Sequence, residues 1–332
     1  MSSQAPAINK PTASVQQAFL TKKSRSLYQD AWARLIKNRA SVGGMIIIAI
    51  FLLIAIFAPL LAPHPPQERY AGKTYLHAFW STSPDPKYAF DPSFPLGTDS
   101  IGRDVLSRVI YGARTSMAVG FIPLTVILLI GMAVGMTAGF FGGQVDNLLM
   151  RLTDIVYAFP DILFFIIMIT ALRDTWIGGL FNGFVLLFVS LALVSWVTVA
   201  RLMRGQVLAV KERDYVEAAK SIGSTDGRIM MKHILPNSLA PIIVSAAFIV
   251  PSAILAEAIL GYLGIGIRPT TDPDAAFPTS WGALLLDGRI AMNNQPAILV
   301  APLICVTLVM LAFTFVGDGL RDALDPLMKG RS

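Results

Sequence analysis

Residues 41–61 read SVGGMIIIAIFLLIAIFAPLL, without a single charged side chain. A bilayer core about 30 Å thick requires roughly 20 such residues in a helix, so this stretch is long enough to span a membrane. It is too long for the apolar region of a secretory signal and follows a polar segment, 1–40. We therefore expect a retained transmembrane helix and not a cleaved leader.

The composition of the whole chain agrees with a membrane protein. Of 332 residues, 54% are hydrophobic and 14% charged, whereas soluble domains carry about 25% charged residues. The net charge of +6 does not indicate nucleic acid, because the basic residues flank apolar spans and form no dense run with aromatics. The single cysteine, Cys305, excludes an intrachain disulfide, and three scattered histidines do not suggest a metal site.

Five further apolar stretches extend the pattern. The third span is the least regular, because its clean run 162–172 is too short to cross and must extend back through Pro160 and Asp161. The expected later spans are 116–141, 152–172, 180–200, 239–260 and 297–316. The predicted fold is an all-α polytopic membrane protein with about six transmembrane helices.

Lysine and arginine predict the orientation. Six spans place both termini on one side, and that side carries 18 of the 27 basic residues, including those of 201–238. Cytoplasmic loops are enriched in Lys and Arg, so we expect both termini inside. The other nine lie mostly in the long loop after the first span, where the rule is weaker.

The N-terminal segment divides into two parts. Residues 1–25 are rich in Ser, Ala, Gln and Pro and are expected to form a mobile cytoplasmic tail. In 26–40, apolar and basic residues recur at helical spacing: Leu27, Trp32, Leu35 and Ile36 beside Arg34, Lys37 and Arg39. This segment is either an amphipathic helix on the cytoplasmic membrane surface or the polar start of the first span's helix.

The long external loop, 62–114, ends in an amphipathic pattern. Ile101, Val105 and Val109 recur at i, i+4, which predicts a helix over 101–113 that leads into the second span. Asp99 or Ser100 would cap it. The helix either seals the bilayer surface or provides a docking surface at the outer mouth, and the pattern alone favours the first interpretation.

Two acids, Asp161 and Glu257, fall within predicted spans. A carboxylate at membrane depth is costly and indicates a functional polar site. Two other interpretations remain open: Asp161 satisfies backbone groups freed by Pro160, and Glu257 lies close enough to the surface to be hydrated. A proton relay would need several such groups facing one another.

The cytoplasmic segment 201–238 is too long for a simple turn and predicts two short helices. The first covers about 213–222, capped by Asp214 and ended by Gly223 at the C′ position. The second covers about 225–235, capped by Ser224 and stopped by Pro236. The first helix presents a thin apolar face suited to docking into a groove of another protein, unless the segment is simply a folded loop without a partner. That face comprises Tyr215, Val216, Ala218, Ala219 and Ile222.

No catalytic motif accompanies this segment. The sequence contains no G-x-x-x-x-G-K-[ST], no H-E-x-x-H and no G-x-S-x-G. We expect a non-catalytic transmembrane subunit.

Several longer motifs occur in order along the chain. Glu217-Ala218-Ala219 with Gly223 precedes HILPN at 233–237; GTDSIGRD stands at 97–104, LGIG at 263–266, SWG at 280–282 and GDGLRDALDP at 317–326. With these motifs the chain after residue 25 resembles the permease subunits of ABC importers. It resembles most the C-type permeases of oligopeptide importers, to which dipeptide, glutathione and nickel permeases are related. Phe313-Thr314-Phe315-Val316, where the family carries an Asn, and an apparent insertion at 270–277 depart from the pattern.

The resemblance implies a type I ABC importer permease in the bacterial cytoplasmic (inner) membrane. Its expected partners are a homologous second permease, two ATPase subunits that bind ATP and Mg, an external solute-binding protein and the lipid bilayer. This chain itself would bind no cofactor. The ATPase-coupling residues would be Tyr215, Glu217, Ala218, Ala219, Ile222 and Gly223, and the outer mouth or binding-protein docking site would involve Asp99, Arg103, Asp104, Arg108 and Trp281.

Peptides are the cargo that the resemblance favours, with nickel or glutathione as alternatives. A gradient-driven secondary transporter would show inverted repeats and several intramembrane acids. A membrane assembly factor would not need the alanine-faced segment around Glu217.

Overall fold

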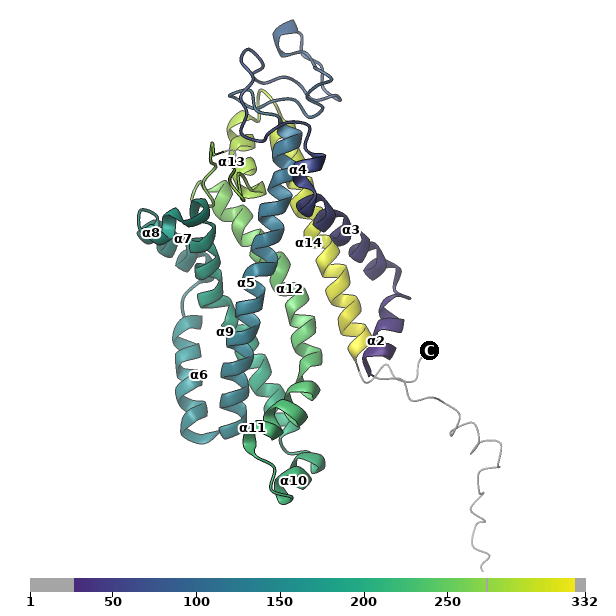
Figure 1. Cartoon of the computed structure of the whole chain (residues 1–332), viewed down its shortest axis with the longest axis vertical. Helices are drawn as coiled ribbons and strands as arrows, with labels where there is room; N and C mark the ends of the chain where they lie inside the picture. The colour runs from purple at the N-terminus through teal and green to yellow at the C-terminus, as the bar shows by residue number, and fades with distance from the viewer. Residues whose placement is uncertain (1–26, 273, 326–332) are drawn as a thin grey trace, which may run out of the picture.

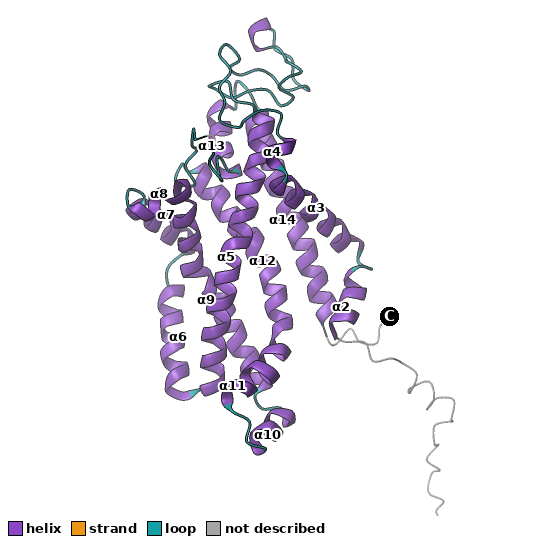
Figure 2. Ribbon diagram, viewed as in Figure 1, coloured by secondary structure: helices purple, strands orange, loops and turns teal. Residues whose placement is uncertain are grey.

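The computed structural model describes residues 27–272 and 274–325, so the predicted tail 1–25 lies outside the described residues. Within these ranges the chain is helical, with one isolated bridge between Thr98 and Asp104 and no strand. Figure 2 shows a bundle of long helices with most of the loop structure gathered at one end. The helices are α2 (Leu27–Leu35), α3 (Arg39–Ile56), α4 (Ala58–Leu61), η1 (Pro86–Tyr88), α5 (Val105–Phe141), α6 (Gly143–Tyr157), α7 (Asp161–Leu172), α8 (Trp176–Gly179), η2 (Leu180–Gly183), α9 (Phe184–Val210), α10 (Asp214–Ser221), α11 (Asp226–Ile229), η3 (Met230–Ile234), α12 (Leu235–Tyr262), α13 (Trp281–Ala291) and α14 (Ala297–Leu324).

The described chain crosses the bundle about six times, as predicted. Five helical segments are long and apolar enough to span a membrane, and the bent pair α6–α7 makes up to six. α5 ends beside the α10 end of the bundle and α9 begins at the opposite end (Figure 1). The chain between them must therefore cross once more, which α6 and α7 do together.

The prediction of one continuous third span over 152–172 is wrong. α6 starts at Gly143 and meets α7 at an angle of 78° after a break of three residues. Pro160 has no N–H to donate and disfavours helical geometry at the residue before it, so the helix ends ahead of it.

Three predicted helix ends are also wrong. α5 begins at Val105 instead of residue 101, because Asp104 is its N-cap. α9 continues ten residues beyond 200, where Arg204 binds Asp146 of α6 through Nε and Nη2 at 2.5 and 2.6 Å. α14 continues to Leu324, beyond the predicted span 297–316, so the cytoplasmic tail that the sequence predicts after this span, 318–332, is helical as far as Leu324.

Pro236 does not stop a helix as predicted. It is the second residue of α12, inside a longer helical segment, and a local π-helical turn can re-satisfy the backbone groups that a proline leaves without a partner. The turn before it, η3, is π-helical. α11, η3 and α12 consequently form one helical segment, Asp226–Tyr262, of 37 residues.

The N-terminal segment forms a helix of its own. α2 ends at Leu35, and the Asn38 side chain caps α3 by accepting from the amides of Ala40 and Ser41 at 3.0 and 3.3 Å. The helix of the first span, α3, begins at Arg39, and a turn separates α2 from it. The inner face of α2 packs on the last turns of α14.

Helix α13 was not predicted. Residues 281–291 lie between the predicted spans 239–260 and 297–316, where the sequence reasoning assigned no helix, yet they form a helix packed against α5, α12 and α14. Ser280 caps it by accepting from the amide of Ala283 at 3.1 Å. Trp281 and Leu284, which are fully buried, join Val109, Ile254 and Val309 in the main core at this end of the bundle.

Glycines bring α5 and α9 into close contact. A Cβ on Gly131 would lie 2.5 Å from the Val199 Cβ, and one on Gly139 would lie 2.8 Å from the Val207 Cβ. Small residues spaced by four allow two membrane helices to approach closely. The lower end of α9, which leads into α10, is therefore held firmly against α5.

Candidate functional site

The α10 segment lies at the end of the bundle away from the external loops (Figure 1). It follows a short turn after α9, and the turn at Gly223 leads from it into α11. Arg213 and Thr225 occupy the N-cap positions of α10 and α11, without side-chain caps. The predicted caps Asp214 and Ser224 are therefore wrong by one residue each.

Burial divides the predicted docking face of α10 into two. Val216 and Ala219 point into the protein and pack in a cluster with Ile229 and other apolar residues of α9, η3 and α12. The prediction that all five residues form one outward face is wrong for these two, because they supply the only fully buried contacts of this short helix.

The rest of the predicted set is exposed. Tyr215 is 42% and Ile222 83% exposed, and Glu217, Ala218 and Gly223 are exposed as well. Tyr215 and Ile222 thus present apolar surface on the side of α10 that faces away from the bundle. The outward face of α10, defined here as Tyr215, Ala218 and Ile222, is smaller than the predicted face.

Gly223 ends α10 as predicted. Its φ of +80° is left-handed, and its amide donates to the Lys220 carbonyl at 2.9 Å. The Ser224 amide donates to the Ala219 carbonyl at 3.1 Å. These two bonds form the Schellman motif, in which glycine avoids the Cβ penalty of the left-handed region.

A hollow of about 440 Å³ separates α10 from the end of α5. Both lysines that line it have partners. Lys211 Nζ donates to the Gly139 carbonyl at 3.1 Å, and Lys220 Nζ lies 5.9 Å from the centre of the Phe140 ring. The hollow is lined by Phe140, Lys211, Glu212, Glu217, Lys220 and Ser221. Exposed charges around an apolar face suit recognition of a protein surface better than chemistry on a small substrate.

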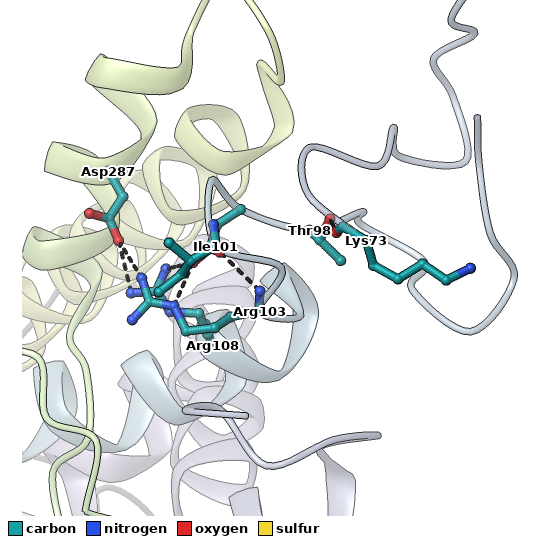
Figure 3. A network of polar contacts seen from close by, with 7 residues as sticks. Lys73, Thr98, Ile101, Arg103, Arg108 and Asp287 are labelled. Carbon is teal, nitrogen blue, oxygen red and sulfur yellow. Dashed lines mark hydrogen bonds and ion pairs between the residues drawn. The ribbon is translucent and has the colours of Figure 1, made fainter. Parts of the chain in front are cut away.

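The opposite end of the molecule contains a buried network of charges (Figure 3). Asp99, only 2% exposed, accepts from Arg103 Nε at 2.6 Å and from Arg108 Nη1 at 2.8 Å. Arg108 Nη2 lies 2.9 Å from Asp287 of α13. The network connects the turn before α5 to α13, and the latter contact was not predicted from the sequence.

The predicted docking residues at this outer end are largely internal. Asp104 caps α5 by accepting from the Ser107 amide at 2.9 Å, and it is fully buried. Trp281 is also fully buried: its Nε1 donates to the Val109 carbonyl at 3.1 Å, and its ring meets Phe51 edge-on at 5.4 Å. Direct docking through Asp99, Asp104, Arg108 or Trp281 is therefore wrong, because none reaches the surface; Arg103 is 14% exposed.

Side chains next to this network hydrogen-bond the external loop. The Leu76 amide donates to Thr98 Oγ1 at 2.9 Å, and Gln295 Nε2 donates to the Leu76 carbonyl.

Burial and the Glu68 carboxylate raise the pKa of Tyr70, in the same loop, to about 12. Its hydroxyl thus remains a donor, to Glu68 Oε2 at 2.8 Å.

The two predicted intramembrane acids occupy different surroundings. Glu257 is fully buried and accepts from Ser116 Oγ at 3.1 Å; Ser116 Oγ also accepts from the Trp281 amide at 3.2 Å. The interpretation that Glu257 is hydrated near the surface is therefore wrong. Asp161 is exposed at the first position of α7, where its negative charge interacts favourably with the helix dipole.

Across the described ranges, no three His, Cys, Asp or Glu side chains converge as metal ligands. The candidate site is therefore the outward face of α10 with the hollow beside it. Two contributors at the outer end escaped the sequence reasoning, Ser116 and Asp287. The α13 helix could have been found from the Ser280 cap and the apolar spacing of Leu284, Gly288 and Ala291.

Two family descriptions match the chain. Residues 104–330 match the "Binding-protein-dependent transport system inner membrane component". Residues 26–78 match the "N-terminal TM domain of oligopeptide transport permease C". The boundary between the two matches lies in the external loop that precedes α5.

Curated relatives match over nearly the full length. The dipeptide transport system permease protein DppC of Alkalihalophilus pseudofirmus is 39% identical over 309 residues, covering 92% of this chain and 91% of the relative. The oligopeptide transport system permease protein OppC of Escherichia coli is 38% identical over 304 residues, covering 92% of both.

Among solved structures, an inward-facing conformation of the MetNI methionine ABC transporter is similar. The TM-score is 0.52 at 18% identity, and the match covers 66% of this chain and 97% of the other. A likeness at this identity concerns the fold, which is that of an ABC importer permease.

Proposed function

Because this chain belongs to the inner membrane components of binding-protein-dependent transport systems, and among them to the C-type permeases of peptide ABC importers, we propose that it forms half of an ATP-driven translocation path for peptides. The second half would be a homologous permease. An external binding protein would deliver the peptide, and two separate ATPase subunits would bind ATP and Mg.

One observation carries the choice of peptides as cargo. The relatives that cover 91–92% of both chains are named as dipeptide and oligopeptide permeases. The match includes the N-terminal α2–α3 segment and the external loop, not only the core that binding-protein-dependent permeases share. Peptide uptake across a bacterial inner membrane is therefore the proposed activity.

The proposed contact with the ATPase is the outward face of α10. Tyr215, Ala218 and Ile222 are exposed on it, while Val216 and Ala219 on the opposite side are packed into the bundle. A partner that pressed on this face would consequently move α10 together with α9 and α12. Glu217, beside the hollow, offers a charge for the partner.

The orientation follows from this proposal and from the charge distribution. The α10 end, with seven basic residues between 201 and 232, would face the cytoplasm and the ATPase subunits. The external loop and α13 would then face the binding protein. Both chain termini would lie inside.

The activity can be tested with the complete transporter. The permease pair, its ATPase subunits and its binding protein would be reconstituted into proteoliposomes. Uptake of labelled di-, tri- and pentapeptides would be measured with and without ATP, alongside Ni²⁺ and glutathione. We expect ATP-dependent accumulation of peptide; accumulation of Ni²⁺ or glutathione without peptide would contradict the proposed cargo.

The α10 contact needs a separate test at Gly223. No heavy atom lies within 4 Å of a Cβ built on it, so a side chain there is limited by φ and not by space. Gly223→Asn introduces a side chain that tolerates left-handed backbone. Gly223→Asp introduces a side chain of nearly the same size that also carries a negative charge. We expect both proteins to insert, with binding-protein-stimulated ATP hydrolysis reduced at least tenfold in Gly223→Asp and far less in Gly223→Asn. Equal activity of the two would contradict a contact at this turn.

A further inference from the structure

Helix α2 and the turn after it expose large apolar side chains on an outer face, away from α14. Trp32 is 58% and Ile36 49% exposed, one helical turn apart. Covering these side chains with an apolar surface would be favourable, because it removes their apolar area from water.

The inner face of α2 fixes its place in the fold. Ala31 and Leu35 are buried against Ala323 of α14. At the start of α3, the Ser41 hydroxyl donates to the Phe315 carbonyl at 3.0 Å, and Gly319 leaves the room that this side chain occupies. The α2–α3 corner is thus held on α14.

The depth of this corner follows from α3. That helix begins at Arg39 with Asn38 as its cap, and it is one of the five long apolar helices. If its apolar body fills the bilayer core, the turn ahead of it lies at the level of the lipid headgroups. Tryptophan is enriched at this depth, where its ring meets apolar chains and its N–H meets water.

The charges beside the exposed face are basic. Lys37 and Arg39 are exposed in the turn between α2 and α3, and Arg34 is half-buried one turn earlier. The acid of this helix, Asp30, lies in its first turn, nearly opposite Trp32 around the helix axis. A cationic edge beside an apolar face is complementary to an anionic membrane surface.

We propose that Trp32, Ile36, Lys37 and Arg39 form a binding surface for anionic phospholipid headgroups in the leaflet at the N-terminal end of α3. Trp32 and Ile36 enter the headgroup–acyl boundary, and Lys37 and Arg39 contact lipid phosphates. Each cation near an anionic surface strengthens binding about fivefold at low salt. Because α2 packs on the last turns of α14, bound lipid also stabilises that end of α14.

The experiment uses the full transporter complex in nanodiscs and measures neither transport nor ATP hydrolysis. The discs contain phosphatidylcholine with an equal molar fraction of either brominated phosphatidylglycerol or brominated phosphatidylcholine. Bromine quenches nearby tryptophan, and subtracting the signal of a Trp32→Phe variant isolates Trp32. We expect stronger quenching of Trp32 by the brominated anionic lipid, by about fivefold or more in local enrichment, and a loss of the difference at high salt.

Charge-neutralising variants provide the control. Lys37→Gln with Arg39→Gln should abolish the preference for phosphatidylglycerol while leaving Trp32 quenched by both lipids. The matched pair Arg69→Gln with Lys87→Gln, in the external loop, should leave the preference intact. Equal quenching by the two lipids in the unaltered protein would refute the headgroup preference. Absence of any Trp32 quenching would refute lipid contact and indicate that another subunit covers this face.

Discussion

The two ends of the bundle hold their polar side chains in opposite ways. At the outer end, Asp99 and Arg108 are buried and paired with each other, and Arg108 also pairs with Asp287. At the α10 end, Glu217 and Ile222 are exposed beside an open hollow. Both ends carry motifs that resemble family motifs. At the outer end the motif residues are buried and stabilise the subunit, whereas at the α10 end they are exposed on its surface. A motif therefore identifies a position in the family fold, and burial distinguishes a stabilising position from one that is available for contact with a partner.

The largest effect is expected at the outer network. Arg108→Met removes a guanidinium that balances Asp99 and Asp287, which should lower the free energy of unfolding by about 3–5 kcal/mol. Unfolding in mixed micelles would measure it. Asp99→Asn combined with Arg108→Met should recover part of the loss. A variant as stable as the parent would remove the contrast between the two ends.

An intermediate effect is expected from two Thr substitutions on α10. Val216→Thr places a hydroxyl in the buried cluster without a partner and should cost about 1–3 kcal/mol of unfolding free energy. Ile222→Thr alters a side chain that is 83% exposed, so stability should change by less than about 0.5 kcal/mol.

The same pair sharpens the proposed role of α10. Binding-protein-stimulated ATP hydrolysis by the assembled complex should fall more in Ile222→Thr than in Val216→Thr at a temperature where both variants remain folded. The reverse order would mean that the outward face of α10 is not the contact.

The smallest effect is expected from Arg201→Met. Arg201 lies 2.7 Å from Asp154, but the arginine is 38% and the aspartate 66% exposed. Exposed ion pairs contribute about 0–1 kcal/mol, so the same arginine-to-methionine change should matter far less than at residue 108. A loss as large as that of Arg108→Met would show that the α6–α9 contact depends on this pair.

Much of the fold could be predicted because apolar length is a local property. The spans around 41–61, 239–260 and 297–316 follow from runs of apolar residues, and the left-handed Gly223 follows from a single residue type. α13 was missed because its apolar spacing is short and follows a region rich in Pro and Gly. The continuation of α9 past residue 200 was missed because charged residues begin there, whereas Met203 and Val207 remain buried against Gly135 and Gly139 of α5, a helix distant in the sequence.

The sequence predicted where the candidate site lies in the chain, but not which of its side chains point inward and which point outward. The sequence places Tyr215, Val216, Ala219 and Ile222 on one short helix. Which of them turns inward depends on Ile229 and Ile234, which return to α10 only after the Gly223 turn. Likewise, the sequence alone suggests that Asp99 and Arg108 are surface charges, because Asp287, which pairs with Arg108, belongs to α13 and is distant in the sequence.

The length of the helical segment Asp226–Tyr262 has a mechanical consequence. At 1.5 Å of rise for each of its 37 residues, it is roughly 55 Å long, enough to reach from the α10 end to the outer end of the bundle. Pivoting such a rod by about 5° about one end displaces the other by about 5 Å, by simple geometry on that length. The π-helical turn η3 and the internal prolines Pro241 and Pro251 are the places where this segment can bend. A displacement beside Gly223 would therefore reach Glu257 and the start of α13 to the extent that these places stay rigid.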